Sequence, residues 1–195
     1  MRFPEMILRL PDWVERFLSE REYVFATVQE RMRLVIELSR LNIENGTGGP
    51  FGAAIFEQKS GRLLAVGVNM VVSSNCSVVH AEIVSIAIAQ HILGHYDLGS
   101  KGMPAYELAA STEPCAMCLG AITWSGVRGL VCGGRDQDAR DVGFDEGLKP
   151  SNWVRLLEQR NISVSRDILR NEAKAVLLQY HEQGGPVYNG RQGSI

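Results

Sequence analysis

The chain has 195 residues, of which 45% are hydrophobic and 22% are charged, and its formal net charge at pH 7 is −2. These proportions are typical of one soluble globular domain, and the lack of a basic surplus disfavours a dedicated nucleic-acid-binding protein. Because no apolar stretch approaches the roughly 20 residues that cross a bilayer, and acids and Pro11 interrupt the apolar N-terminal segment, we expect neither a membrane span nor a secretory signal.

The first part of the chain is predicted to be helical and then to form a β-hairpin. Apolar side chains recur at helical spacing from residue 12 to residue 44, with Asp12 as a candidate N-cap, and the glycines of "ENGTGGPFG" (44–52) end this region. Two apolar runs then flank "KSGR" (59–62), which is a turn signal, so residues 53–72 are expected to form a hairpin.

Helices and strands alternate through the rest of the chain. The expected elements are a helix over 80–93 stopped by Gly94, a strand over 106–111, a helix over 115–125, a strand over 127–134, a polar loop over 135–150, a helix over 151–160, a short strand over 162–165, a helix over 167–182 and an irregular tail. This alternation predicts a three-layer α/β domain, and the hairpin makes its sheet mixed.

Three residues at predicted helix starts have the chemistry of metal ligands. Cys115 and Cys118 form a C-x-x-C pair where free N–H groups and the helix dipole favour the thiolate, and His80 begins another helix. In a chain without an export signal we expect the four cysteines to be reduced, in the cytoplasm, with Cys76 in a loop and Cys132 in the core. His80, Cys115 and Cys118 predict a zinc site with three protein ligands, in which the fourth position is left for water.

Glu82 follows His80 by two residues, at the start of an apolar helix where an unpaired carboxylate is costly to bury. Zinc lowers the pKa of a water that it binds to about 7, and a carboxylate beside that water can accept its proton and pass it to a substrate. Glu82 is therefore a candidate catalytic base rather than a fourth ligand.

Together, "HAE" (80–82) and "PCAMC" (114–118) resemble the paired signature of the zinc-dependent nucleoside and nucleobase deaminases. The resemblance covers about residues 22–182. It implies a three-layer α/β/α cytidine deaminase-like fold with a mixed, about five-stranded sheet, one Zn²⁺ per chain and Glu82 as the catalytic proton carrier. It also implies a helical extension over residues 1–21, a deaminase domain over 22–183 and a tail over 184–195.

Within this family the chain resembles the guanine deaminase branch, on "STEPCAMC" (111–118), "GAITWSGVR" (120–128) and "GFDEG" (143–147). That resemblance implies attack of water at C2 of guanine to give xanthine and ammonia, with ammeline, an aminotriazine, as a side or main substrate. Phe51 and Phe144 are expected to contact the base, Asp145 or Glu146 to read its edge, and Glu146 to act as a second proton carrier.

The same resemblance implies further substrate-binding positions and a partner. Asn69 offers an amide donor and acceptor to a purine, Ala81 lies between His80 and Glu82, and Tyr188 lies in a tail that closes the pocket of its own or of a partner subunit. A homodimer through the helices beside the metal site is implied, with tail swapping as one arrangement. The residues alone also fit a solvated acidic loop at 143–147, local backbone bonds at Asn69, a core aromatic at Phe51 and a mobile tail.

Two other functions stay open. A transfer-RNA adenosine deaminase predicts a basic rim and salt-sensitive RNA binding, which the acidic "GFDEG" and the near-neutral segment 171–185 disfavour. A non-catalytic, zinc-stabilised interaction domain predicts a metal without an open coordination position, which Glu82 at the deaminase position disfavours. We therefore expect a small purine or triazine substrate, with no membrane and no nucleic acid as partner.

Overall fold

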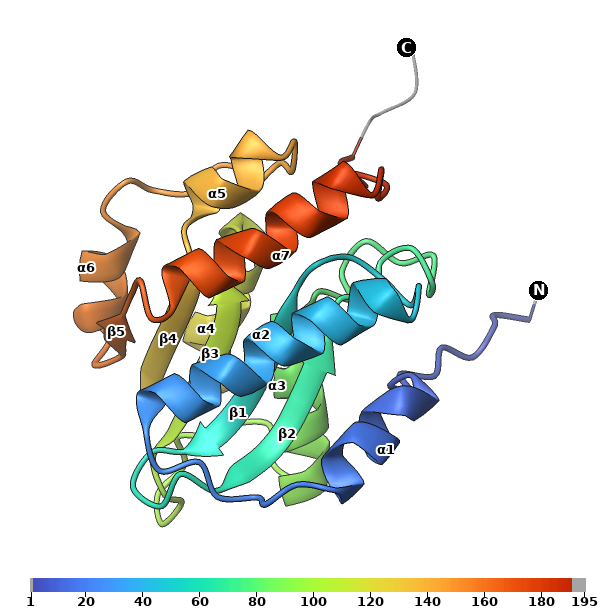
Figure 1. Ribbon diagram of the computed structural model, residues 1–195. Coiled ribbons are helices and arrows are strands. Elements are labelled where there is room, and N and C mark those ends of the chain that lie inside the picture. The colour runs from blue at the N-terminus through green and yellow to red at the C-terminus, as the bar shows by residue number, and fades with distance from the viewer. Residues whose placement is uncertain (1, 191–195) are drawn as a thin grey trace.

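A mixed five-stranded sheet forms the centre of the computed structural model, which describes residues 2–190 (Figure 1). The strands are β1 (Gly52–Glu57), β2 (Leu63–Val68), β3 (Tyr106–Thr112), β4 (Gly129–Gly134) and β5 (Ser163–Ser165), in the order β2-β1-β3-β4-β5. β1 pairs antiparallel with β2 and β3, whereas β4 runs parallel to β3 and β5. The predicted hairpin and mixed sheet are confirmed.

Helices cover both faces of the sheet (Figure 1). α1 (Asp12–Ser19), α2 (Val28–Glu44) and α7 (Arg170–Glu182) pack into one core cluster, whereas α3 (Ala81–Leu93), α4 (Ala116–Ser125) and α6 (Trp153–Glu158) pack into the other. Side chains of β1 alternate between the two clusters, with Ala54 and Phe56 in the first and Ala53 and Ile55 in the second. The three-layer architecture follows from this division.

A glycine brings the start of α3 close to the sheet. A Cβ at Gly67 of β2 would lie 2.1 Å from the carbonyl oxygen of Ala81, the first residue of α3. No side chain fits into so short a gap, so glycine at this position lets α3 begin directly against β2. The same approach fixes His80 and Glu82, which stand immediately on either side of Ala81. Gly94, with φ of +62°, then ends α3 as predicted.

Two local predictions were wrong. Asp12 is the first helical residue of α1 and not its cap, because Pro11 occupies the N-cap position and the Asp12 carboxylate pairs with Arg9 at 2.9 Å. The predicted polar loop 135–150 contains a short helix, α5 (Asp136–Asp141), which carries no apolar period in "DQDARD". The Asp138 carboxylate accepts the Arg135 backbone N–H at 2.8 Å and thereby stabilises the start of this helix.

The helical region predicted over residues 12–44 is divided. Residues 20–27 leave the helical path, and Val24 forms an isolated antiparallel bridge with Arg62 of the hairpin. Thr27 and Glu30 then begin α2 with a reciprocal capping box. Trp13 and Val14 of α1 are buried in the same core cluster as α2. None of the helices among residues 2–190 is long and apolar enough to cross a membrane.

Candidate metal centre and active site

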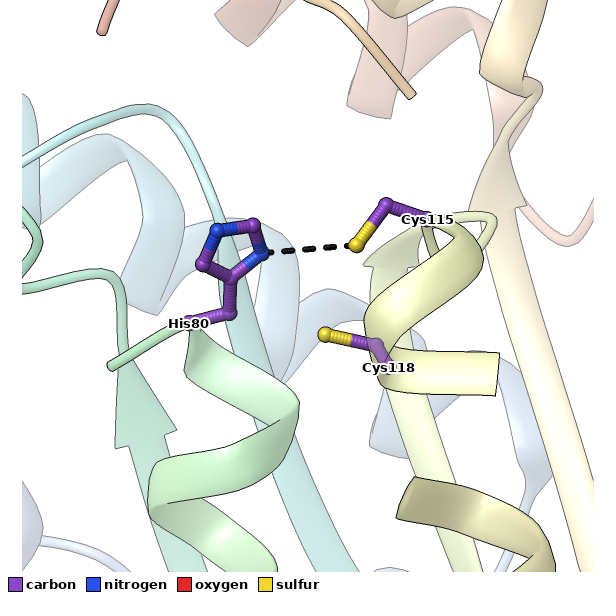
Figure 2. A group of neighbouring side chains, drawn as sticks. All are labelled: His80, Cys115 and Cys118. Carbon is purple, nitrogen blue, oxygen red and sulfur yellow. Dashed lines mark hydrogen bonds between the residues drawn. The ribbon is translucent and has the colours of Figure 1, made fainter. Parts of the chain in front are cut away.

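Two helix starts bring the predicted metal ligands together. His80 is the N-cap residue of α3, Cys115 is the N-cap residue of α4, and Cys118 lies in the first turn of α4. Figure 2 shows the imidazole and both thiols pointing toward one another, with His80 Nδ1 3.6 Å from Cys115 Sγ. One ligand atom from each residue lies within 4.8 Å of the other two. The chain thus assembles, at neighbouring helix starts, residues that are 35 positions apart.

The electrostatics of this group suit a zinc ion. The pKa of the Cys115 thiol is lowered to about 4, first by a hydrogen bond from the Cys118 side chain and also by His80. As the donor in that bond, Cys118 has its pKa raised. A thiolate, a second thiol and an imidazole form a donor set that zinc prefers, and three protein ligands are the number found in catalytic zinc sites. His80, Cys115 and Cys118 therefore form the zinc-binding site.

Glu82 lies on the first turn of α3, and its side chain is buried beside the metal ligands. Burial is the main cause of the raised pKa of its carboxyl group, and the negative charge of the Cys115 thiolate raises it further. Both effects make the proton on this carboxyl harder to remove. The side chain lines the cavity that opens beside the ligands, which gives it access to a bound molecule.

That cavity has a volume of about 370 Å³ and contains most of the predicted substrate contacts. Besides the metal ligands His80 and Cys115 and the carboxyl of Glu82, its lining includes five residues predicted from the sequence, which are Phe51, Phe144, Asp145, Glu146 and Tyr188. Segments that are distant in the sequence meet here: the end of the loop before β1, the loop after α5 and the C-terminal tail. A purine base fits the size range of such a small-molecule site.

Asp145 and Glu146 differ in their surroundings. Asp145 is exposed, and its carboxylate accepts the backbone N–H of Gly147 at 2.9 Å. Glu146 is 5% exposed, its Oε2 atom has no hydrogen-bond partner, and burial raises its pKa to about 8. The Glu146 carbonyl oxygen accepts the Ala116 N–H at 2.9 Å, which ties this loop to the start of α4. Glu146 is therefore the acid that the loop turns inward.

An aromatic cluster forms one wall of the cavity. The Phe144 ring lies 5.0 Å from that of Phe51 and 5.2 Å from that of Tyr188, both in edge-to-face contacts, and it stacks on Tyr180 at 6.0 Å. Such contacts stabilise the positions of the rings as well as burying their area. Phe144 thus joins the loop after α5 to α7 and to the tail.

Asn69 and Ala81 lie behind this wall and do not line the cavity. Asn69 is 1% exposed, and its Oδ1 accepts the Val71 N–H at 3.2 Å, while its Nδ2 has no partner. The Asn69 backbone N–H donates to the Phe51 carbonyl oxygen at 3.0 Å. Ala81 is buried against Gly67 of β2. Their predicted contact with substrate stays a prediction.

Among the cavity residues that were not predicted from the sequence, Glu113 and Asn189 make long-range polar contacts. Glu113 is buried and accepts a hydrogen bond from Arg166 at 2.6 Å, and Lys149 lies 3.6 Å from its carboxylate. Asn189, next to Tyr188 in the tail, accepts the Asp145 N–H at 2.8 Å and donates to the Gly143 carbonyl at 2.9 Å. An acid directly before "PC" was the available signal for Glu113, whereas Asn189 had none because its partners lie more than 40 residues away. Residues 191–195 of the predicted tail lie outside the described residues.

Comparisons with known proteins agree with this geometry. The family model for the cytidine and deoxycytidylate deaminase zinc-binding region matches residues 26–134, which is more than half of the chain. The matched range contains all three metal ligands and Glu82. It ends with β4, so the loop of Glu146 and the tail lie beyond it.

Similar proteins cover nearly the whole chain. A solved guanine deaminase from Nitrosomonas europaea is 46% identical, with a TM-score of 0.87 over 91% of this chain and 97% of that one. The bacterial protein NE0047, solved in complex with 2,6-diaminopurine, is also 46% identical, with a TM-score of 0.87 over 95% and 97%. The guanine deaminase of Bacillus subtilis is 35% identical over 131 residues, 67% of this chain and 80% of that protein.

Proposed function

Because the chain belongs to the cytidine and deoxycytidylate deaminase zinc-binding family, we propose that it is a guanine deaminase, which hydrolyses guanine to xanthine and ammonia. One observation carries the choice of a small base. Within residues 2–190, three buried side-chain atoms lack a hydrogen-bond partner: Asn69 Nδ2, Glu146 Oε2 and Tyr188 Oη. Each unpartnered atom costs about 1–3 kcal/mol, and all three belong to the cavity or lie behind its wall.

A guanine base carries groups that match these atoms. Its ring N–H and amino groups can donate to the inward carboxyl of Glu146, and its carbonyl and ring nitrogens can accept from Tyr188 and, after a shift of the cavity wall, from Asn69. Phe51 and Phe144 supply the apolar contact that a purine ring needs. The exposed Asp145 holds the loop through Gly147 and leaves the recognition of the base to Glu146.

The reaction requires a nucleophilic water at C2 and protons for the departing ammonia. His80, Cys115 and Cys118 would hold the zinc ion, which when bound would supply a water of lowered pKa and a positive charge close to the reacting carbon. Glu82 accepts a proton from the attacking water and delivers it to ring N3. Glu146, with a pKa of about 8, holds a proton at neutral pH and donates it to the amino group as the C2–N bond breaks. Glu82, which is a carboxylate again after delivering its first proton to N3, removes the remaining hydroxyl proton as the C2 carbonyl forms, and the two carboxyl groups then exchange the proton through solvent.

The proposal extends to the assembly and the location of the protein. Met117 in the first turn of α4 and Trp124 near its C-terminal end are exposed, Trp124 by 86%, which supports a homodimer formed through this helix. The tail up to Gly190 lines the cavity, and in a dimer it closes the cavity of its own subunit or that of the partner subunit. Free Cys115 and Cys118 suit a reducing, cytoplasmic location. We also propose that the chain consists of a helical extension (1–21), a deaminase domain (22–183) and a tail (184–195).

The experiment measures ammonia release by the zinc-loaded protein from guanine, with ammeline, cytosine, adenine, guanosine and adenosine in parallel. We expect release from guanine to exceed that from the nucleosides, because Tyr188 and Asn189 cover the cavity where a ribose would extend. Release chiefly from ammeline would keep the mechanism and change the substrate. No release from any free base, with zinc present at one ion per chain, would refute the proposed function and lead to assays on transfer RNA.

A further inference from the structure

Asn42, at the C-terminal end of α2, contacts neither the cavity nor the metal ligands, yet it is fully buried at the back of the site. Its Nδ2 group donates to the carbonyl oxygens of Gly49 and Asn69, both at 2.8 Å. Gly49 and Asn69 belong to two different segments, the loop before β1 and the end of the hairpin. One side-chain amide therefore links the loop that carries Phe51, in the cavity wall, to the end of the hairpin that carries Asn69.

These two carbonyls are part of a closed set of hydrogen bonds. The Phe51 N–H also donates to the Gly49 carbonyl at 2.8 Å, and the Asn69 N–H donates to the Phe51 carbonyl at 3.0 Å. Asn42 completes this set from the side of α2. The positions of Phe51, in the cavity wall, and of Asn69, with its unpartnered Nδ2, depend on the same amide group.

The orientation of the Asn42 amide is determined by two further residues. The indole N–H of Trp13 is only a donor, and it donates to the Thr47 hydroxyl at 3.0 Å. The single hydrogen of that hydroxyl is then directed to Asn42 Oδ1, at 2.7 Å. With Oδ1 accepting from Thr47, both N–H bonds of the amide are free to reach the two carbonyls. A flipped amide would place its oxygen against both carbonyls and lose both of these bonds.

The turn from Thr47 to Gly49 is packed tightly against Asn42, Asn69 and Tyr188. A Cβ at Gly48 would lie 1.8 Å from the Asn69 carbonyl oxygen and 2.8 Å from Asn42 Nδ2. A Cβ at Gly49 would lie 2.1 Å from the Tyr188 hydroxyl oxygen. Backbone, amide and tail are thus in direct contact, so a small displacement of this turn reaches Asn69 and Tyr188 together.

We propose that Asn42 is a positioning residue for substrate recognition, and that Trp13 of α1, through Thr47, holds it in the orientation that places Phe51 and Asn69. This inference rests on the proposed function only for the identity of the substrate. It assigns the N-terminal helix a part in the site: α1 supplies the donor at the far end of the chain of hydrogen bonds. Asn42 itself touches no reacting atom, so its effect is expected in binding and not in the chemical step.

The test compares matched variants that are loaded with zinc. Asn42→Asp keeps the oxygen facing Thr47 but removes both donors, and Asn45→Asp makes the same chemical change at an exposed amide three residues later that bonds only the Leu41 carbonyl. Thr47→Val keeps the shape of the side chain but removes the hydroxyl, whereas Thr47→Ser keeps the hydroxyl. Trp13→Phe removes the indole N–H and keeps an aromatic ring in the core.

We expect Asn42→Asp to raise the KM for guanine by about 10- to 100-fold, with kcat and zinc content nearly unchanged. The Asn69 carbonyl loses its side-chain donor, the Gly49 carbonyl keeps only the Phe51 N–H, and the two segments are no longer linked. Thr47→Val and Trp13→Phe should also raise the KM, but by only about 3- to 10-fold, since each acts through Asn42. Thr47→Ser and Asn45→Asp should behave like the wild-type protein. If Asn42→Asp does not fold, the comparison of Thr47→Val with Thr47→Ser tests the proposal, because only the first variant should raise the KM.

A second readout does not depend on the substrate. Hydrogen exchange of the backbone amides at residues 69–71, measured without ligand, should quicken in Asn42→Asp and Thr47→Val and not in the two controls. Unchanged exchange together with an unchanged KM would overturn the proposal. It would also be overturned if kcat fell and KM rose together, alongside a general loss of stability. Should the wild-type protein release no ammonia from guanine, the proposed function fails, while the exchange result still decides the role of Asn42.

Discussion

Glu82 and Glu146 are both buried acids with raised pKa values, yet they reach the site in different ways. Glu82 is placed by a helix that starts against Gly67 of β2, whereas Glu146 is placed by an irregular loop held through its carbonyl to Ala116. A carboxylate on a helix start is fixed more rigidly than one on a loop. This difference suits Glu82 for the repeated transfer of a proton, and Glu146 for holding the base and giving a single proton to its amino group.

Replacing Glu82 by Gln should stop the reaction without removing the metal. The amide keeps the size of the side chain but cannot accept the proton of the attacking water, so we expect turnover of guanine to fall by at least about 10²- to 10⁴-fold. Zinc content, measured by atomic absorption, should stay at one ion per chain. Glu44→Gln, at the exposed end of α2, is the control. Substantial turnover by the zinc-loaded Glu82→Gln protein would contradict the assigned role.

Replacing Gly49 by Ala should displace Tyr188 from the cavity. The new Cβ would lie 2.1 Å from the Tyr188 hydroxyl oxygen, which is the end of a side chain in the tail, so the ring should move before the core does. We expect the KM for guanine to rise about tenfold, as one aromatic contact is lost, with little change in thermal stability. Gly120→Ala, where a Cβ meets nothing, serves as the control. An unchanged KM would show that Tyr188 does not contribute to binding.

At the residue scale, the sequence predicted what short motifs specify. His80, Glu82, Cys115 and Cys118 follow from two short signatures whose spacing has a chemical reason. Asn42, Glu113 and Asn189 were not found because they act through partners that are distant in the chain, such as Arg166 for Glu113 at a separation of 53 residues. No local periodicity encodes a contact of that kind.

At the scale of elements, α5 is the piece that the sequence missed, and it joins the active-site loop to α7. The Asp138 carboxylate of α5 is 1% exposed and accepts hydrogen bonds from Arg170 of α7 at 2.9 and 3.0 Å. Lys174 adds a contact at 3.4 Å. Because five of the six residues of α5 are polar and Ala139 alone is apolar, no apolar period indicates this helix. These long-range partners and the burial of Ala139 against Leu177 and Tyr180 stabilise it. The longer elements α2, α3 and β1 were predicted because each buries a periodic apolar face.

The Asp138 contact predicts how stability depends on pH. The hydrogen bond from Arg170 lowers the pKa of Asp138 to about 2, below the roughly 3.9 of an unfolded aspartate. A lowered folded-state pKa contributes stability that is present above about pH 4 and is lost as the pH falls toward 2. Asp138→Asn should therefore cost about 2 kcal/mol in the free energy of unfolding at pH 7.

Urea unfolding of both proteins at pH 7, 4 and 3 measures this difference. We expect it to shrink as the pH falls, since protonation abolishes the same interaction in the wild-type protein. Asp141→Asn, at the exposed end of α5, is the control and should change little. A difference that stays constant from pH 7 to pH 3 would show that the lost stability does not come from the carboxylate charge.

At the scale of the whole molecule, the metal centre joins the two helices α3 and α4 behind which the sheet lies. Removal of zinc by a chelator should lower the thermal midpoint and abolish turnover, because binding of the metal is coupled to folding. Cys115→Ala should reproduce both effects, and Cys76→Ala, outside the ligand group, should reproduce neither. Differential scanning fluorimetry with and without added zinc measures the shift. A Cys115→Ala protein with full zinc content would remove that residue from the ligands.

The spacing of the ligands has a consequence for the order of folding. Cys115 and Cys118 are neighbours on one helical turn, whereas His80 is 35 positions away along the chain, beyond β3. A zinc ion held by the two thiols would close that long loop only when the imidazole binds it as well. A permanent cross-link of that span would lower the conformational entropy of the unfolded chain, which corresponds to roughly 4 kcal/mol of free energy at 25 °C. Binding of an ion by the two thiols alone would thus be a local event, whereas ligation by His80 as well would tie the start of α3 to the start of α4.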